Sequence, residues 1–185
     1  MKNEPYSDKR KSYIKIGELY FWTATINNWN HLLKEDKFKE VIIGSLRTLS
    51  ERRLVDVFAF VIMPNHMHLI LRTNALNGKE TVQGSILKFT AHQFKKLLKD
   101  NPVELIKYAV DAHNKKFEFW QRDSLAVHLY SEHVMLQKLN YIHLNPLTVH
   151  WNLVNEPSKY NYSSAKYYEM NEKNFDFLID LMQEF

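Results

Sequence analysis

LVDVFAFVI, MPN and HMHLILRT follow one another over residues 54–73. The first and last segments are rich in β-branched and aromatic residues, which predicts strands over 54–62 and 66–73. Met63-Pro64-Asn65 separates the two segments, and a proline cannot donate a hydrogen bond to a strand ladder. The short connection therefore predicts an antiparallel pair of strands.

Further elements are predicted on both sides of this pair. LYFWTATI (19–26) predicts a strand, and 36–52 predict a helix with Asp36 as its N-cap. The apolar face of this helix is expected to comprise Phe38, Val41, Ile42, Leu46 and Leu49. A second helix is predicted over 80–99, with Ile86, Phe89, Phe94, Leu97 and Leu98 turned inward.

The C-terminal half is less regular. Residues 101–116 fit either a helix or a loop, and a strand is predicted near 125–129. Ser131 and Glu132 begin a helix over 131–144 that Pro146 ends, with Leu136, Leu139, Ile142 and Leu144 as its anchors to the sheet. The tail from 157 to 185 mixes loop and short helix.

This order predicts an α+β protein with a ferredoxin-like (RRM-like) βαββαβ unit. Such a unit is an antiparallel sheet with helices on one face, and here a C-terminal helix is added. We expect one domain over residues 1–185, with its core at about 18–166 and with 1–12 and 167–185 peripheral. The fold alone predicts no function, because many unrelated activities share it.

Composition excludes several classes of protein. The 185 residues contain no cysteine, so disulfides, a cysteine-ligated zinc site and a cysteine nucleophile are excluded. The N-terminal sequence has no apolar signal region and no long apolar run follows, which predicts a cytoplasmic protein without a membrane span. A net charge of +4 and a pI of about 9.1 permit binding to a polyanion.

Two histidines stand out in the second strand of the pair. Residues i and i+2 of a strand point to the same face, so His66 and His68 project together while Met67 points into the core. Two adjacent imidazoles form half of a divalent metal site, and oxygen ligands would complete it. The alternative is a pair of strand histidines with no metal.

A tyrosine and an asparagine share a face of the last helix. Tyr141 and Asn145 are four residues apart, so they lie one above the other. A phenol beside a cation can act as a nucleophile, and an asparagine carbonyl is a suitable ligand for Mg²⁺ or Mn²⁺. The alternatives are a structural tyrosine at the core edge and an asparagine that only ends the helix. His143 points to another face, and we expect it to be structural or exposed.

The two motifs together resemble those of a known family. VIMPNHMHLIL (61–71), followed by YIHLNP (141–146), resembles the Y1 tyrosine HUH transposases of the IS200/IS605 type, closest to the REP-associated tyrosine transposases. FWQRDSLAVHLY (119–130) is similar to the segment leading into that family's nucleophile helix, and Tyr160 with Tyr162-Ser163-Ser164 to its closing motif. The resemblance covers roughly residues 18–166.

The resemblance implies a metal-dependent DNA transposase. Tyr141 would be the nucleophile, forming a 5′-phosphotyrosine and a free 3′-OH, and His66, His68 and Asn145 would hold Mg²⁺ or Mn²⁺. The implied partner is single-stranded DNA with a hairpin, cleaved by a monomer or a homodimer. The family also includes host-domesticated copies.

Residues that bind the DNA are expected on a basic groove with aromatic platforms. The candidates for the groove are Lys88, Lys95, Lys96, Lys115, Lys116 and Arg122, and the candidates for stacking are Phe117, Phe119 and Trp120. The structural alternative is that the lysines form the solvated face of a helix and that Trp120 belongs to the core.

Three other functions fit parts of the pattern. A ferredoxin-like nucleic-acid-binding protein without catalysis would need aromatic residues on its central strands, where this chain has His66 and His68. A replication-initiation or relaxase nickase has similar chemistry but often places its tyrosine elsewhere. An inactive transposase remnant is the third, although all four expected site residues are present.

Overall fold

A four-stranded antiparallel sheet forms the centre of the protein. The computed structural model describes residues 14–113 and 115–184, so the segment 1–12, expected to be peripheral, lies outside the described residues. The strands are β1 (Leu19–Thr25), β2 (Val55–Ile62), β3 (His66–Thr73) and β6 (Leu125–His128). Their order is β2-β3-β1-β6, and every neighbouring pair is antiparallel. This confirms the ferredoxin-like arrangement.

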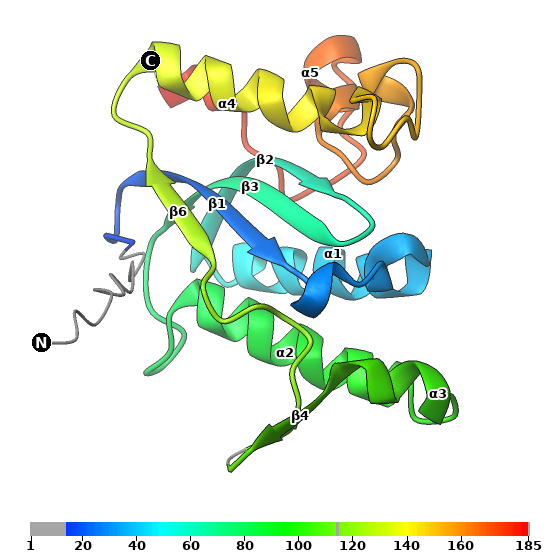
Figure 1. The fold of residues 1–185 in the computed structure, drawn as a ribbon. Helices are drawn as coiled ribbons and strands as arrows, with labels where there is room; N and C mark the ends of the chain where they lie inside the picture. The colour runs from blue at the N-terminus through cyan, green and yellow to red at the C-terminus, as the bar shows by residue number, and fades with distance from the viewer. Residues whose placement is uncertain (1–13, 114, 185) are drawn as a thin grey trace, which may run out of the picture.

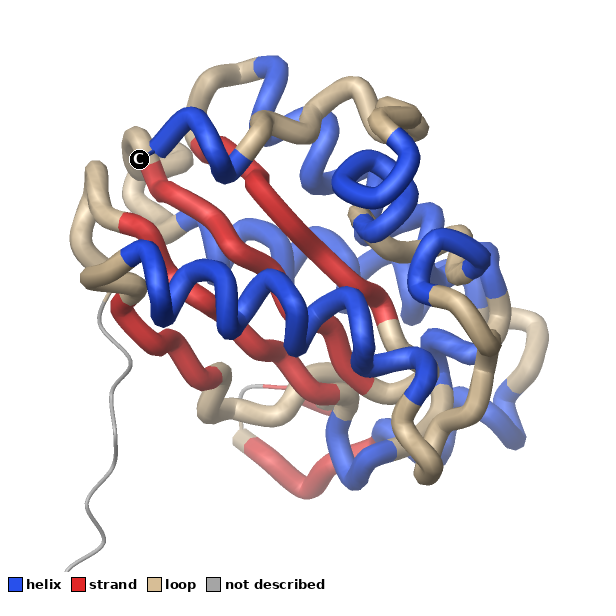
Figure 2. The backbone as a smooth tube through the Cα atoms, turned by 90° about the horizontal axis from the view of Figure 1, so that it is seen from above, coloured by secondary structure: helices blue, strands red, loops and turns tan. Residues whose placement is uncertain are grey.

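Helices cover both faces of the sheet. Helices α1 (Asp36–Glu51) and α2 (Val82–Leu97) lie on one face, and α4 (Glu132–Leu144) lies on the other (Figure 1). In the view from above, α4 lies in front of the strands of the sheet (Figure 2). The added C-terminal helix therefore forms a third layer, opposite to the two helices of the ferredoxin-like unit.

Side chains of β3 alternate between the two layers of the core. Met67, Leu69 and Leu71 pack with residues of α1 and α2. Ile70 packs on the other face with Met135, Leu139 and Ile142 of α4. The same alternation places His66 and His68 on the face that α4 covers.

The inward face of α2 is narrower than predicted. Ile86, Phe94 and Leu98 are buried as expected, but Phe89 is 47% exposed and Leu97 is 41% exposed. The buried stripe runs at intervals of four residues, and it includes Thr90. Phe89 and Leu97 stand directly before members of this stripe, so each is rotated by about 100° around the helix toward solvent.

Two details of the other helices differ from prediction. Glu35, not Asp36, is the N-cap of α1, and Asp36 is the first helical residue. In α4, Ser131 caps the helix through its side chain, which accepts a hydrogen bond from Val134 N–H. Leu144, a predicted anchor, is 52% exposed, whereas Met135, which was not predicted, is buried in the core.

Residues 101–116 are neither a single helix nor a plain loop. Helix α3 (Pro102–Leu105) is followed by a hairpin of β4 (Ala109–Ala112) and β5 (Lys115–Phe117). Tyr108 fixes the base of the hairpin, because its buried ring stacks on Phe119 at a centroid distance of 4.7 Å. The strands are too short to give a recognisable pattern of alternation.

The C-terminal segment contributes to the core. Residues 167–185 were expected to be peripheral, yet Phe177, Leu178 and Leu181 are buried. Ile179 N–H donates to the Val57 carbonyl at 3.0 Å, so the C-terminal segment forms a bridge to the free edge of β2. The remaining regular elements are α5 (Ala165–Met170) and short 3-10 turns at Asn27–Trp29, Leu32–Lys34, Ile106–Tyr108, Asn145–Leu147, Pro157–Lys159 and Leu181–Glu184. No helix within the described residues is long and apolar enough to cross a membrane.

Candidate functional site

A cavity of 280 Å³ lies between the sheet and the C-terminal end of α4. It is found where β1 ends and β3 begins, since Thr25 pairs with His66 and Thr23 with His68. The lining residues are Thr23, Thr25, Trp29, His66, His68, Tyr141, Asn145, Thr148 and Trp151. The four residues predicted from the two motifs therefore meet in one cavity, although more than 70 residues separate the motifs in the sequence.

Hydrogen bonds orient both imidazoles. His66 Nδ1 lies 2.7 Å from Asn65 Oδ1, and Asn65 Nδ2 donates to the Trp29 carbonyl at 3.3 Å. Because an amide oxygen only accepts, His66 carries its proton on Nδ1 and has a lone pair on Nε2. His68 Nδ1 lies 2.8 Å from Thr23 Oγ1, and a proton donated there likewise leaves a lone pair on Nε2.

Both imidazoles are neutral at physiological pH. Burial lowers the pKa of His66 to about 4. Burial also lowers the pKa of His68 to about 3, with the charges of His66 and Lys138 acting in the same direction. A neutral imidazole is the form that ligates a metal, so both rings are ready to coordinate without losing a proton.

Two buried polar atoms of the cavity lining lack a partner. Within the described residues, neither His68 Nε2 nor Asn145 Oδ1 has a hydrogen bond. An unpaired buried polar group costs about 1–3 kcal/mol, so each such group calls for an explanation. An imidazole nitrogen and an amide oxygen that face one cavity fit a divalent cation, which would satisfy both.

Tyr141 differs from the other tyrosines near it. Its ring is 47% exposed, lies 5.2 Å from the His68 ring and meets the Phe21 ring edge to face at 5.8 Å. By contrast, the hydroxyls of Tyr160 and Tyr168 donate to backbone carbonyls at 2.8 Å. Burial raises the pKa of both phenols well above its usual value. Tyr141 is therefore the tyrosine of this group that is free to react.

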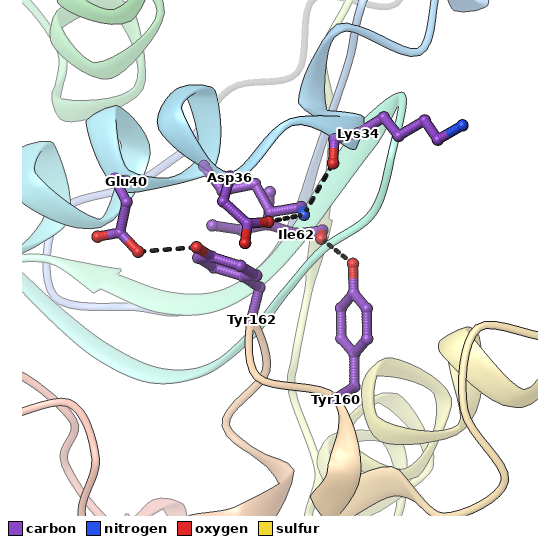
Figure 3. A network of polar contacts seen from close by, with 7 residues as sticks. Lys34, Asp36, Glu40, Ile62, Tyr160 and Tyr162 are labelled. Carbon is purple, nitrogen blue, oxygen red and sulfur yellow. Dashed lines mark hydrogen bonds and ion pairs between the residues drawn. The ribbon is translucent and has the colours of Figure 1, made fainter.

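The segment 160–164 ties α4 to the strand pair that carries the two histidines. The Tyr160 hydroxyl donates to the carbonyl of Ile62, at the end of β2, and the Tyr162 hydroxyl donates to Glu40 of α1 (Figure 3). The Ile62 N–H in turn donates to the Tyr162 carbonyl at 2.9 Å, so the segment pairs with the edge of β2. These hydrogen bonds fix the position of Ile62, which lies four residues before His66.

Ser164 links this segment to α4. Its hydroxyl lies 2.9 Å from His143 Nε2 and accepts a hydrogen bond from Phe60 N–H at 3.0 Å. His143 was expected to be either structural or exposed. It is only 6% exposed, so it is structural. The two sides of the cavity, the sheet and α4, are thus held together by Tyr160, Tyr162 and Ser164. These three residues belong to the segment that is similar to the family's closing motif.

We expect the buried His143 to make the protein sensitive to acid. Burial lowers its pKa in the folded protein to about 4, whereas an exposed imidazole in the unfolded chain has a pKa of about 6.5. The unfolded state therefore binds more protons between these values, and stability present above pH 6.5 is lost as the pH falls toward 4. The loss from this group is about 3 kcal/mol.

Guanidinium denaturation at pH 7 and at pH 4.5 measures this loss. His143→Gln should show a smaller difference between the two pH values than the wild type. The His133→Gln variant, altered at an exposed histidine in the first turn of α4, should keep the wild-type difference. An unchanged difference in His143→Gln would rule out this group as the cause.

Several lining residues were not predicted from the sequence. Trp29 and Trp151 stand beside the histidines, with the Trp151 ring 5.8 Å from the His66 ring. Trp29 is 60% exposed and has a left-handed backbone conformation with φ 55°, which is unusual for a bulky residue. Asn27 and Asn28 favour a turn at this point, but nothing in their sequence shows that the turn ends at the cavity.

Lys138 lies close to Tyr141 and was not predicted from the sequence either. It lies one turn before Tyr141 on α4, with Nζ 4.9 Å from the Phe21 ring centroid and 5.6 Å from the Tyr141 ring centroid. Over the described ranges, no carboxylate forms an ion pair with it. An uncompensated cation therefore stands beside the phenol.

The predicted DNA-binding residues are only partly brought together. Lys88, Lys95, Lys115 and Lys116 line a second and larger hollow, whereas Lys96 and Arg122 lie outside its lining. Trp120 cannot act as a stacking platform, because it is 6% exposed and its indole N–H donates to Thr90 Oγ1 at 2.9 Å. Phe119 is 3% exposed and is likewise part of the core. Of the three aromatic candidates, Phe117 alone is only half-buried.

Comparison with known proteins bears on the fold. No model of a known protein family matches the sequence, and neither does any curated protein. Among solved structures, a REP-associated tyrosine transposase bound to a REP hairpin matches over 92% of this chain and 91% of its own, with a TM-score of 0.59 and 18% identity. The chain has the fold of a tyrosine transposase.

A second solved structure carries a similar description. It is a transposase from Deinococcus radiodurans R1, with 17% identity, a TM-score of 0.40 and coverage of 77% of this chain and 95% of its own. The tyrosine transposase fold rests on the first of the two structures, which covers nearly the whole of both chains.

Proposed function

We propose that this chain is a single-stranded DNA endonuclease and strand transferase, a transposase that nicks and rejoins DNA through Tyr141. The observation that carries the proposal is the cavity itself. It combines an exposed phenol, 5.2 Å from the His68 ring, with two buried ligand atoms that lack a partner. The tyrosine transposase fold supports the same conclusion.

In the proposed reaction, the Tyr141 oxygen attacks the phosphorus of a phosphodiester. The new bond joins the phenol oxygen to phosphorus, and the bond from phosphorus to the 3′ oxygen breaks. The phenol gives up its proton to water, and the leaving 3′ oxygen takes up a proton from water to form a 3′-OH. The product is a 5′-phosphotyrosine. A 3′-OH can later attack this phosphotyrosine and release Tyr141, so strands are exchanged without a nucleotide cofactor.

We propose that His66, His68 and Asn145 hold a divalent cation, Mg²⁺ or Mn²⁺. Both imidazoles have lone pairs on Nε2, and the Asn145 amide oxygen supplies a hard donor. A bound ion would polarise the phosphoryl oxygen and offset the charge that develops on it. Asn65 and Thr23 keep the two imidazoles in the tautomer that can ligate, through the hydrogen bonds to Nδ1.

We propose that the substrate is single-stranded DNA beside a hairpin. The protein would bind it as a monomer or as a homodimer. The tyrosine transposase of similar fold is bound to a REP hairpin. Trp29 and Trp151 at the cavity offer aromatic faces on which unpaired bases can stack. Lys88, Lys95, Lys115 and Lys116, which line the second hollow, would contact the DNA backbone.

An adduct assay tests the proposed function. Purified protein is incubated with single-stranded DNA from the flanks of its own gene, with Mg²⁺ or Mn²⁺, and a protein–DNA adduct that survives SDS is expected. EDTA should abolish the adduct if a divalent ion is needed. Tight binding without an adduct on either strand would instead favour a non-catalytic nucleic-acid-binding protein.

We expect Lys138→Met to slow formation of the adduct by about tenfold or more. The ammonium group beside Tyr141 can pair with a phosphate oxygen or with the developing phenolate, and a charge-assisted contact is worth about 1.5–3 kcal/mol. Single-turnover rates at saturating DNA measure the effect. Lys138→Arg should retain most of the rate because it keeps the charge, and Lys166→Met on α5 serves as a control. Equal rates for Lys138→Met and wild type would exclude the role.

A further inference from the structure

A cavity larger than that of the candidate active site lies away from it. It has a volume of 560 Å³ and lies between α2 and the β4–β5 hairpin. Both elements are on the side of the sheet opposite to α4 (Figure 1). The lining residues are Lys88, Ala91, His92, Lys95, Ala112, His113, Lys115, Lys116, Phe117 and Phe119. We refer to this cavity as the basic hollow.

Positive charge is concentrated on both walls of the basic hollow. On α2, Lys88, His92 and Lys95 follow one another at intervals of four and three residues, which places them on one helical face. The hairpin supplies Lys115 and Lys116 from the opposite wall. None of the residues that line the hollow is acidic.

Part of this charge is not compensated by carboxylates. Lys88 pairs with Glu80, and Lys115 pairs with Glu118. Among the residues that the structure describes, neither Lys95 nor Lys116 forms an ion pair. Lys95 instead lies over the half-buried Phe117 ring, with its Nζ 5.4 Å from the centroid. Two unpaired ammonium groups beside an aromatic ring are suited to a polyanion that carries flat, stackable groups.

A backbone connection links the basic hollow to the candidate active site. The Asn27 N–H donates to the Phe119 carbonyl, and the Gln121 N–H donates to the Thr25 carbonyl, both at 2.8 Å. Phe119 lines the hollow and Thr25 lines the active-site cavity. Thr25 and Asn27 are about 7 Å apart along an extended chain, and the ladder adds about 5 Å across it. The two cavities are therefore neighbours around the end of β1.

From this arrangement we infer that the basic hollow is a second DNA-binding site, which holds the phosphate backbone of the strand that runs out of the active-site cavity around the end of β1. The path of that strand, from the active-site cavity to the basic hollow, rests on the proposed function. Binding in the hollow itself requires only a nucleic-acid backbone, so it is measurable without cleavage. The hollow would keep the DNA attached while its 3′-OH is free.

Two double variants, each of which removes two positive charges, test the inference. Lys95→Ala/Lys116→Ala removes the unpaired cations of the hollow. Lys96→Ala/Lys99→Ala removes two exposed lysines from α2 and the turn after it, and neither of these lines the hollow. The probe is a fluorescent thirty-residue oligo(dT), with its Kd measured by anisotropy at several salt concentrations. All variants are made in the full chain and checked for an unchanged melting temperature.

We expect the hollow variant to bind about five- to tenfold more weakly, and the control to stay within about twofold of wild type. The slope of the logarithm of the binding constant against the logarithm of the salt concentration should also become shallower. We expect a change of about 0.7 per lost phosphate contact, and so of about 1.4 for two contacts. Equal losses in both variants, or no loss in either, would overturn the inference. Weaker binding by the hollow variant in the Tyr141→Phe background upholds it even if no adduct ever forms, which separates it from the proposed function.

Discussion

Tyr141→Phe is expected to abolish the covalent protein–DNA adduct, with the rate of its formation reduced by about 10⁴-fold or more. Removal of the phenol oxygen removes the nucleophile itself, and no other tyrosine lines the cavity. The substitution should leave folding and DNA binding unchanged, because the Tyr141 side chain is about half exposed and contributes ring contacts that phenylalanine retains.

The measurement is the SDS-resistant adduct on end-labelled single-stranded DNA. Tyr130→Phe is a matched control, since Tyr130 is 76% exposed and lies outside the cavity lining. The control should form adduct at the wild-type rate. An adduct that persists in Tyr141→Phe and disappears in Tyr130→Phe would assign the nucleophile to Tyr130, before the start of α4, and refute the proposed site.

Replacement of either strand histidine is expected to remove metal binding. His68→Ala deletes a buried ligand nitrogen that has no other partner, and we expect Mn²⁺ affinity to fall by about 100-fold or more. Asn145→Ala should have a smaller effect, of about tenfold, because water can replace a neutral oxygen ligand. Isothermal titration with Mn²⁺ measures both affinities without DNA and without reaction.

His133→Ala is the matched control for the histidine variants. His133 is exposed near the start of α4, outside the cavity lining, and should leave Mn²⁺ affinity unchanged. Thr23→Val tests the orienting contact, and we expect an intermediate loss because the His68 Nδ1 proton loses its acceptor. Wild-type affinity in His68→Ala would show that the ion, if bound at all, is held elsewhere.

Regular periodicities predicted the elements of the candidate site. The two-residue repeat of a strand places His66 and His68 together, and the four-residue spacing of a helix aligns Tyr141 with Asn145. What no local pattern could give is which helix covers which strand. The convergence of these two pairs, more than 70 residues apart, depends on α4 packing against the face of β3 that carries Ile70.

The unpredicted residues come from contacts of the same long range. Trp29 and Trp151 reach the cavity from turns whose sequences show only that the chain bends. Lys138 gains its position from Phe21 of the neighbouring layer. Conversely, Trp120 was a candidate for stacking because its segment is basic and aromatic. Its bridge to Ile26 and its hydrogen bond to Thr90 draw the ring into the core instead.

The segment 160–164 joins α4 to β2 by hydrogen bonds within one chain, and so Tyr141 meets the histidines of its own molecule. We propose that a reactive centre assembled in this way needs no encounter between copies of the protein. The amount of adduct formed in a fixed time should then scale linearly with protein concentration, down to the lowest concentrations.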